Sequence, residues 1–150
     1  MTRRKASLPT LKRKLDTLFS KYVRMSESNP AGFATCVTCG KRDLFTRMDC
    51  GHFIPRGSLA TRWDERNCHV QCQYCNRFRV DAYVDYTLWM LSHYGPEVVE
   101  ELQALKGKPV KLTRFDLEAR IDEVAGKLAT LAMGYVNEPA GRQYALESLS

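Results

Sequence analysis

Six cysteines and three histidines hold much of the chemistry open to this chain of 150 residues. Four of the cysteines form two C-x-x-C pairs, Cys36 with Cys39 and Cys72 with Cys75. A structural zinc ion takes four such ligands at tetrahedral angles, and each C-x-x-C pair supplies two thiolates from one turn. The spacing therefore predicts a structural Zn²⁺ held by all four cysteines. The alternative is four reduced cysteines without a metal.

The other two cysteines, Cys50 and Cys68, lie outside the pairs. We expect partly buried thiols at both positions, with an exchange against a zinc ligand as the alternative. Six cysteines are few for a disulfide scaffold in a chain of this length, and their paired spacing favours metal binding.

A histidine and two asparagines lie between and just after the two pairs. His52 falls on an expected strand, Asn67 begins the next strand, and Asn76 directly follows the last cysteine. Phosphodiester hydrolysis needs a base that deprotonates water near neutral pH and a divalent cation that stabilises charge on the phosphate. This order of parts resembles that of a ββα-metal nuclease, in which a histidine activates water and an asparagine orients it. In this chain we expect His52 to activate the water and Asn67 to orient the site. A histidine that makes only structural hydrogen bonds is the alternative.

The catalytic cation, Mg²⁺ or Mn²⁺, prefers oxygen ligands, which Asp49 and Asn76 are able to offer. In a regular strand, however, Asp49 and His52 point to opposite faces. Asp49 therefore reaches the cation only if the backbone bends, which Gly51 would permit. His69 on the next strand is the alternative ligand.

Basic side chains near this stretch suit a nucleic-acid partner. The net charge is +6, and residues 1–30 hold eight Lys or Arg against two acids. Guanidinium and ammonium groups position a phosphate backbone without reading its sequence. The alternatives are a solvated basic surface and local ion pairs. Asp64 and Glu65, for example, are expected to pair with neighbouring arginines, with a metal contact as the alternative. The residues expected to contact DNA are Arg56, Arg62, Arg66, Arg77, Arg79, Lys12 and Lys14.

Apolar spacing predicts helices towards both ends of the chain and short strands between them. Apolar residues recur every three or four positions over 11–25 and 117–131, as on one face of a helix. Thr10 is the expected N-cap of the first helix, and Thr113 with Asp116 resembles a capping box. The expected elements are a basic arm (1–9), a helix (10–25), strands (33–39, 45–48, 50–54 and 67–71) with a polar turn (41–43) and a loop (58–66), helices (76–94, 97–105 and 113–132) and a tail (134–150).

The stretches Asp49–Ser58 (DCGHFIPRGS) and Trp63–Arg77 (WDERNCHVQCQYCNR) resemble the phage NinG (Rap) recombination-endonuclease family. With LKRKLDTLFSKYVR near the start and the Tyr94–Gly95 pair, the resemblance covers about residues 10–130. It implies an HNH-type nuclease acting on branched recombination intermediates such as D-loops and Holliday junctions. The C-x-x-C-N ending also resembles phage endonuclease VII-type junction resolvases, which implies that Asn76 is a catalytic metal ligand.

This chain departs from the family pattern at one position. In many HNH enzymes an acidic metal ligand immediately precedes the catalytic histidine, whereas Gly51 stands there in this chain. The departure leaves Asp49 as the nearest acidic residue on that strand.

We therefore expect one α+β domain over residues 1–150, with a zinc-stabilised ββα-metal, HNH-like core (33–94) between an N-terminal helix and C-terminal helices (96–132). The expected function is a metal-dependent DNA endonuclease that uses Zn²⁺ for structure and Mg²⁺ or Mn²⁺ for catalysis. One alternative is a zinc-stabilised DNA-binding module without catalysis. The other is a protein-interaction adaptor built on the two terminal helices.

The terminal helices span about two heptads each, short of the three or four that indicate a coiled coil. We expect them to pack on each other or across a homodimer, which would suit an enzyme that cuts two strands related by symmetry. No apolar run approaches the ~18 residues of a membrane span, and no apolar segment follows the basic start as in a secretory signal. The expected location is the cytoplasm of a host cell.

Overall fold

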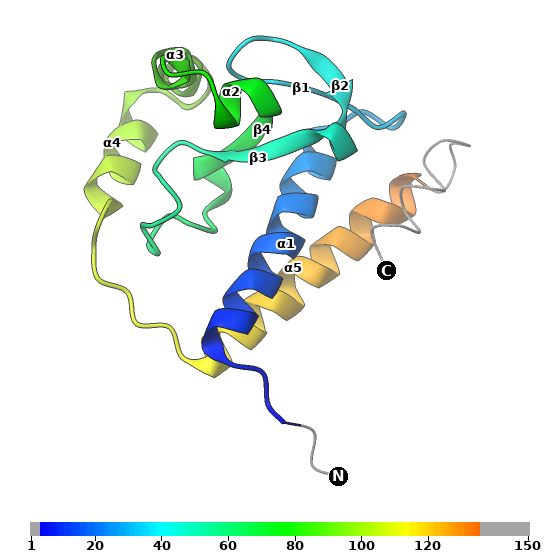
Figure 1. Cartoon of the computed structure of the whole chain (residues 1–150), viewed down its shortest axis with the longest axis vertical. Helices are drawn as coiled ribbons and strands as arrows, with labels where there is room; N and C mark the ends of the chain where they lie inside the picture. Colours follow the sequence, from blue (N-terminus) through cyan, green and yellow to red (C-terminus); the bar gives the residue numbers. More distant parts are fainter. Residues whose placement is uncertain (1–3, 136–150) are drawn as a thin grey trace.

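The computed structural model describes residues 4–135, so residues 1–3 of the expected arm and 136–150 of the expected tail lie outside it. Figure 1 shows an α+β arrangement, as expected, with two long helices below two small sheets and shorter helices. Within the described part, no helix is both long and apolar enough to cross a membrane. The elements are α1 (Leu8–Ser26), β1 (Phe33–Thr35), β2 (Arg42–Leu44), the 3₁₀ helix η1 (Phe45–Arg47), β3 (Met48–His52), η2 (Glu65–Asn67), β4 (Cys68–Cys72), α2 (Gln73–Arg77), α3 (Ala82–Tyr94), α4 (Pro96–Leu105) and α5 (Arg114–Tyr135).

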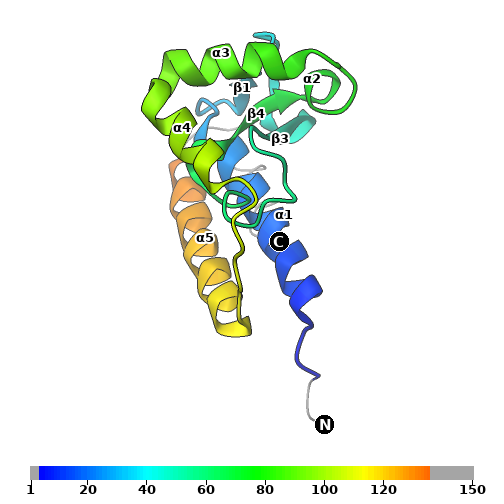
Figure 2. The ribbon, with the colours of Figure 1, turned by 90° about the vertical axis from the view of Figure 1, so that its left-hand side faces the viewer.

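The two long helices, α1 and α5, lie side by side in both ribbon views (Figures 1 and 2). Leu15 of α1 and Leu117 of α5 are completely buried in one apolar cluster that also holds Ile121. At the other end of the pair, Tyr135 Oη donates a hydrogen bond to the carbonyl oxygen of Met25 at 2.9 Å. The expectation that these helices pack on each other is confirmed within one chain.

Both long helices begin with side-chain caps. Ser7, and not Thr10, is the N-cap of α1, because its Oγ accepts from the Thr10 N–H at 3.3 Å. Pro9 of the expected arm therefore lies in the first helical turn, where its missing N–H is not needed. The expected capping box is confirmed at α5: Thr113 N donates to Asp116 Oδ2 at 2.8 Å, and Asp116 N donates to Thr113 Oγ1 at 3.2 Å.

Two antiparallel strand pairs form the centre of the fold. β1 pairs with β2, and β3 pairs with β4 in a register that sets Met48 opposite Cys72 and His52 opposite Cys68. The last two expected strands lie within a few residues of β3 and β4. The turn after β1 also contacts this sheet, because Val37 N donates to the Val70 carbonyl of β4 at 3.0 Å.

The segment before β3, residues 33–47, differs from expectation. The expected strand 33–39 stops at Thr35, because Cys36 begins a tight turn in which Gly40 N donates to the Cys36 carbonyl at 2.9 Å and Gly40 has a φ of 79°. The expected turn 41–43 is instead mostly strand β2, and the expected strand 45–48 is instead mostly the 3₁₀ helix η1.

The helix expected over 76–94 is broken in two. The N–H groups of Phe78 and Arg79 both bond to the Tyr74 carbonyl, which ends α2. After the break, α3 buries Tyr86 and Met90 in a cluster with Phe53, Ile54 and Leu102. The chain therefore turns between α2, which carries Cys75, and α3, which covers this cluster.

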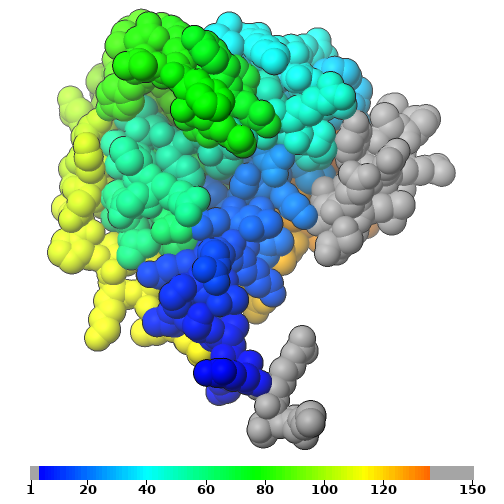
Figure 3. Space-filling view, in the orientation of Figure 1, coloured from blue at the N-terminus to red at the C-terminus, as the bar shows by residue number. Residues whose placement is uncertain are grey.

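A segment that is distant in the sequence packs beside the loop after β3. The chain between α4 and α5 runs beside it on the surface in Figure 3. Gly107 N donates to Ser58 Oγ at 3.2 Å. The expected loop 58–66 is confirmed, except that its end forms η2. This loop supplies the main-chain partner of His52.

Candidate functional site

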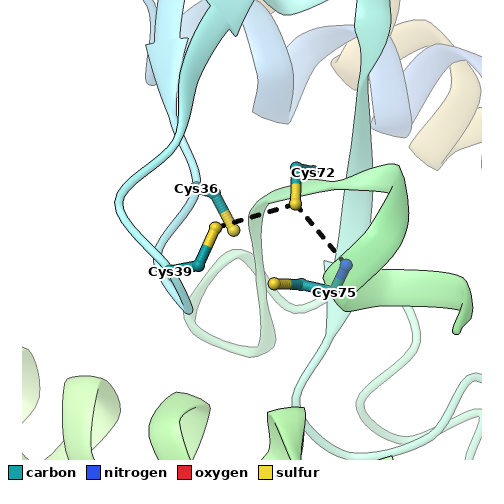
Figure 4. A group of neighbouring side chains, drawn as sticks. All are labelled: Cys36, Cys39, Cys72 and Cys75. Carbon is teal, nitrogen blue, oxygen red and sulfur yellow. Dashed lines mark hydrogen bonds between the residues drawn. The ribbon is translucent and has the colours of Figure 1, made fainter. Parts of the chain in front are cut away.

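Four cysteine sulfurs meet where the turn after β1 faces the start of α2 (Figure 4). The Sγ atoms of Cys36, Cys39, Cys72 and Cys75 all lie within 4.8 Å of one another. Those of Cys39 and Cys72 are 3.8 Å apart. Sulfurs held at 2.3 Å from a tetrahedral zinc ion lie about 3.8 Å apart. The group can therefore bind a metal ion such as zinc, as the sequence predicts.

Burial and backbone contacts tune these thiols in opposite directions. Burial alone would raise the pKa of Cys36, but hydrogen bonds from the backbone, first from Cys72 and then from Cys39, lower it to about 7. Burial and the Cys72 and Cys39 thiols raise the pKa of Cys75 to about 12. A bound divalent cation would lower the pKa of Cys75 again, because a thiol that coordinates a metal is deprotonated.

Cys50 and Cys68 stay outside this group of four. Burial, and next the neighbouring Cys50 thiol, raise the pKa of Cys68 well above its ordinary value. Cys68 is fully buried, whereas Cys50 is partly buried. Both therefore fit the expected thiols, with Cys68 more deeply enclosed than expected.

A cleft of about 490 Å³ brings three of the expected catalytic residues together. His52 and Asp49 of β3 line it, and so does Asn76 of α2. The first two were expected on opposite faces of a strand, and the β3 register is unbroken between them. The lining of the cleft nevertheless includes residues from both faces of β3, namely Asp49, Cys50 and His52.

Gly51 leaves room for the Gln71 side chain and does not bend the strand. A Cβ atom at this position would lie 1.9 Å from Oε1 of Gln71, which crosses over it from β4. The Gln71 amide is itself held by a 2.6 Å hydrogen bond to Thr38 Oγ1. Tyr86 Oη donates to the Gly51 carbonyl at 2.8 Å, which fixes the strand from α3.

The main chain holds the His52 ring in one tautomer. Its Nε2 lies 2.9 Å from the carbonyl oxygen of Arg62. Because a carbonyl only accepts, Nε2 carries the hydrogen and Nδ1 keeps its lone pair in the neutral ring. Burial lowers the pKa of His52 below its ordinary value, against the opposing hydrogen bond to Arg62 and the charge of Asp16. A neutral ring with a free acceptor nitrogen is what a general base requires.

Asn67 holds the loop that follows His52. It is completely buried. Its Oδ1 accepts from Ile54 N at 2.7 Å, and its Nδ2 donates to the Ile54 carbonyl at 3.1 Å and the Thr61 carbonyl at 3.0 Å. With both ends of its amide bound to the backbone, Asn67 fixes the loop that carries the partner of His52.

The two expected cation ligands touch each other. Asn76 Nδ2 donates to Asp49 Oδ2 at 3.0 Å, and Arg77 binds both Asp49 oxygens at 2.8 Å. Burial acts to raise the pKa of Asp49, but the hydrogen bonds from Arg77 and Asn76 outweigh it and lower the pKa. The carboxylate is therefore ionised, and both of its oxygens accept hydrogen bonds from these two neighbours.

His69 lies elsewhere. It is buried, with Nδ1 2.5 Å from Glu27 Oε1 and Nε2 3.1 Å from the Arg66 carbonyl. It lines a separate pocket of about 620 Å³ with Trp89 and His93. The expectation of His69 as an alternative ligand of the catalytic cation does not fit this position.

Two of the five expected arginines line the cleft. Arg56 is 61% exposed and Arg77 is 53% exposed, so both guanidinium groups can reach a ligand from solvent. Lys14 is exposed on α1, and Lys12 is partly exposed there. These four residues remain candidates for phosphate contacts.

The other three arginines are held by acids. The expected pairing of Asp64 with Arg66 is confirmed at 2.9 Å, whereas Glu65 binds Lys127 at 2.7 Å. Arg77 is paired with Asp49 as well, so it is their absence from the lining of the cleft that makes these three poorer candidates for phosphate contacts than the sequence suggests. The pairs are Arg62 with Asp16, Arg66 with Asp64 and Glu101, and Arg79 with Asp81 and Asp85.

Asp16 is the cleft residue that the sequence does not reveal. It lies on α1 and binds Arg62, 46 residues later in the chain. An acidic residue in a basic amphipathic helix carries no local signal of such a contact. The fold alone brings it to the cleft.

A family model described as "Bacteriophage Lambda NinG protein" matches residues 3–133 of the chain. The protein named ninG of Escherichia phage lambda is 31% identical over 70 residues, which are 46% of this chain and 34% of that protein. The ninG proteins of Escherichia phage 933W (31%) and Salmonella phage P22 (30%) match with the same coverage. The match thus spans about a third of the length of these relatives. No solved structure matches the chain.

Loss of one sulfur should release the metal. Cys39 is exposed, so Cys39→Ser removes a ligand without opening a cavity in the core. We expect bound zinc, measured by elemental analysis, to fall from about one ion per chain to well below that. The thermal midpoint should fall by about 10 °C, since each kcal/mol lost is worth about 3 °C at this size. Cys50→Ser is the matched control, and equal zinc content in both variants would contradict the assignment.

Proposed function

Because the chain belongs to the NinG family of bacteriophage proteins, we propose that it is a metal-dependent endonuclease that hydrolyses DNA phosphodiester bonds. One observation carries the proposal: His52, Asp49 and Asn76 line one cleft. A base, an ionised carboxylate and an amide in one open cleft form the minimum set for metal-assisted attack of water on a phosphodiester.

In this proposal His52 is the general base. Its Nδ1 accepts a proton from the attacking water while Nε2 keeps its hydrogen bond to the Arg62 carbonyl. Asp49 and Asn76 would hold Mg²⁺ or Mn²⁺, which supplies positive charge for the phosphate and the leaving oxygen. Asn67 acts through the backbone, because its amide ties Ile54 to Thr61 and so sets the position of the loop that carries Arg62.

The proposed DNA path crosses basic side chains that the protein leaves exposed. Arg56 and Arg77 line the cleft, and Lys12 and Lys14 lie on α1, the helix that contributes Asp16 to it. Guanidinium pairs suit phosphates. We propose branched recombination intermediates such as D-loops and Holliday junctions as substrates, in the cytoplasm of the host cell. That choice rests on the sequence resemblance described above.

A homodimer remains part of the proposal, since two strands related by symmetry need two clefts. Its interface is not the pair of apolar stripes on α1 and α5, because these bury each other within one chain. A second copy would therefore dock on another surface.

Replacement of His52 should abolish cleavage and leave the fold intact. His52→Gln keeps a donor for the Arg62 carbonyl but removes the base, and we expect a fall in rate of about 10²–10⁴-fold. The assay compares a synthetic four-way junction with a linear duplex, with Mn²⁺ and with EDTA. His93→Ala, at an exposed position outside the cleft, is the control. Binding of both DNAs without any metal-dependent cutting by the wild type would sink the nuclease proposal in favour of a zinc-stabilised DNA-binding module.

The pH profile should carry the signature of a buried base. Burial lowers the pKa of His52, so the ring stays neutral and active to a lower pH than a free histidine would. The cleavage rate should rise with pH through a midpoint below about 6.5 and stay level up to about pH 8. The measurement is kcat/KM against pH for the wild type. A midpoint above the ordinary histidine value would contradict the assigned base.

A further inference from the structure

Asp16 makes a set of contacts that end at His52. Its Oδ1 accepts from Arg62 Nε at 2.9 Å and from Trp63 Nε1 at 3.0 Å, and its Oδ2 accepts from Arg62 Nη2 at 2.5 Å. This bidentate contact between a guanidinium and a carboxylate is strong and directional. One acid on α1 thus binds two consecutive residues of the loop that follows β3.

Arg62 makes contacts through both its side chain and its carbonyl oxygen. Its side chain is only 14% exposed, and its guanidinium lies 5.0 Å from the centre of the Trp63 ring. Its carbonyl oxygen is the partner of His52 Nε2 at 2.9 Å and also accepts from Cys68 Sγ at 3.6 Å. Side chain and carbonyl of the same residue therefore face Asp16 and His52 respectively.

We propose that Asp16 is a positioning residue of the candidate active site: by holding the Arg62 side chain, it sets the Arg62 carbonyl that fixes the His52 ring with Nδ1 free. The catalytic half of this proposal rests on the proposed nuclease function, whereas the effect on the ring does not. Asn67 secures the same loop at Thr61, one residue earlier. The loop is thus held from two sides, by a buried amide and by an acid on α1.

The geometry favours this role over a metal ligand. Both Asp16 oxygens are taken by donors of the loop, and Arg56 Nη2 lies 3.7 Å from Oδ2. A cation at Asp16 would have to displace these contacts and approach two guanidinium groups. Asp49 also accepts at both oxygens, but it pairs with one arginine and not two, so it is the better place for a cation.

The test compares the wild type with Asp16→Asn. The readout is long-range proton–nitrogen NMR of the His52 ring, which distinguishes the two neutral tautomers without any need for activity. The wild type should show the form with hydrogen on Nε2, and Asp16→Asn should show a mixture. The charged groups facing this ring are Asp16, Arg56 and Arg62, so spectra are taken at a pH where the ring is neutral.

Two further variants complete the experiment. Arg62→Lys keeps a cation beside Asp16 but loses the bidentate contact, so it should also give a mixture of His52 tautomers. This second variant keeps the test available if Asp16→Asn fails to fold. Thr17→Ala, at an exposed neighbouring position on α1, should leave the ring unchanged. Cleavage by Asp16→Asn should fall by up to about 10²-fold in kcat, as for a misplaced catalytic group.

A single unchanged tautomer in folded Asp16→Asn or in Arg62→Lys would overturn the proposal. So would a loss of Mn²⁺ binding in Asp16→Asn with an unchanged ring, which would make Asp16 a metal ligand. Absence of cleavage by the wild type would contradict the nuclease function alone, because the tautomer readout stands without it.

Discussion

The approach of four cysteine sulfurs is the constraint on which the cleft depends. Ionised sulfurs within 4.8 Å of one another repel unless a cation lies between them. That group joins the turn after β1 to the first residues of α2 and so closes the long segment of chain between the two pairs. Cys75 belongs to the group, and Asn76 and Arg77, the next residues of α2, enter the cleft. The position of the sulfurs therefore sets the position of two cleft residues.

A second restraint acts at the opposite end of the β3–β4 pair. The register places Met48 opposite Cys72 beside the sulfurs and His52 opposite Cys68 at the other end. There His52 depends on a loop that α1 holds through Asp16 and that Asn67, the last residue of η2, also holds. The cleft thus lies between a part fixed by sulfur ligation and a part fixed by hydrogen bonds to a buried loop. Burial of the ring at this second part lowers the pKa of His52.

The spacing of residues close in the sequence predicted those features that depend on nearby residues alone. The two C-x-x-C pairs indicated the sulfur group, the apolar periodicity indicated α1 and α5, and Thr113 with Asp116 indicated a cap. Long-range contacts decided the rest. The break between α2 and α3 follows from where Cys75 and Tyr86 must lie, and the tautomer of His52 follows from a main-chain carbonyl, which has no residue-type signal. Asp16 was invisible for the same reason, since its partner is 46 residues away.

We propose that one small frame carries two metal sites of different kinds, one of sulfur and one in the cleft. Crystals grown with Mn²⁺, with diffraction recorded on both sides of the zinc and manganese absorption edges, test it most directly. We expect a zinc signal among Cys36, Cys39, Cys72 and Cys75, and a separate manganese signal at Asp49 and Asn76 on the His52 side of the cleft. Manganese bound elsewhere, or absent from the cleft at saturating concentration, would contradict the claim.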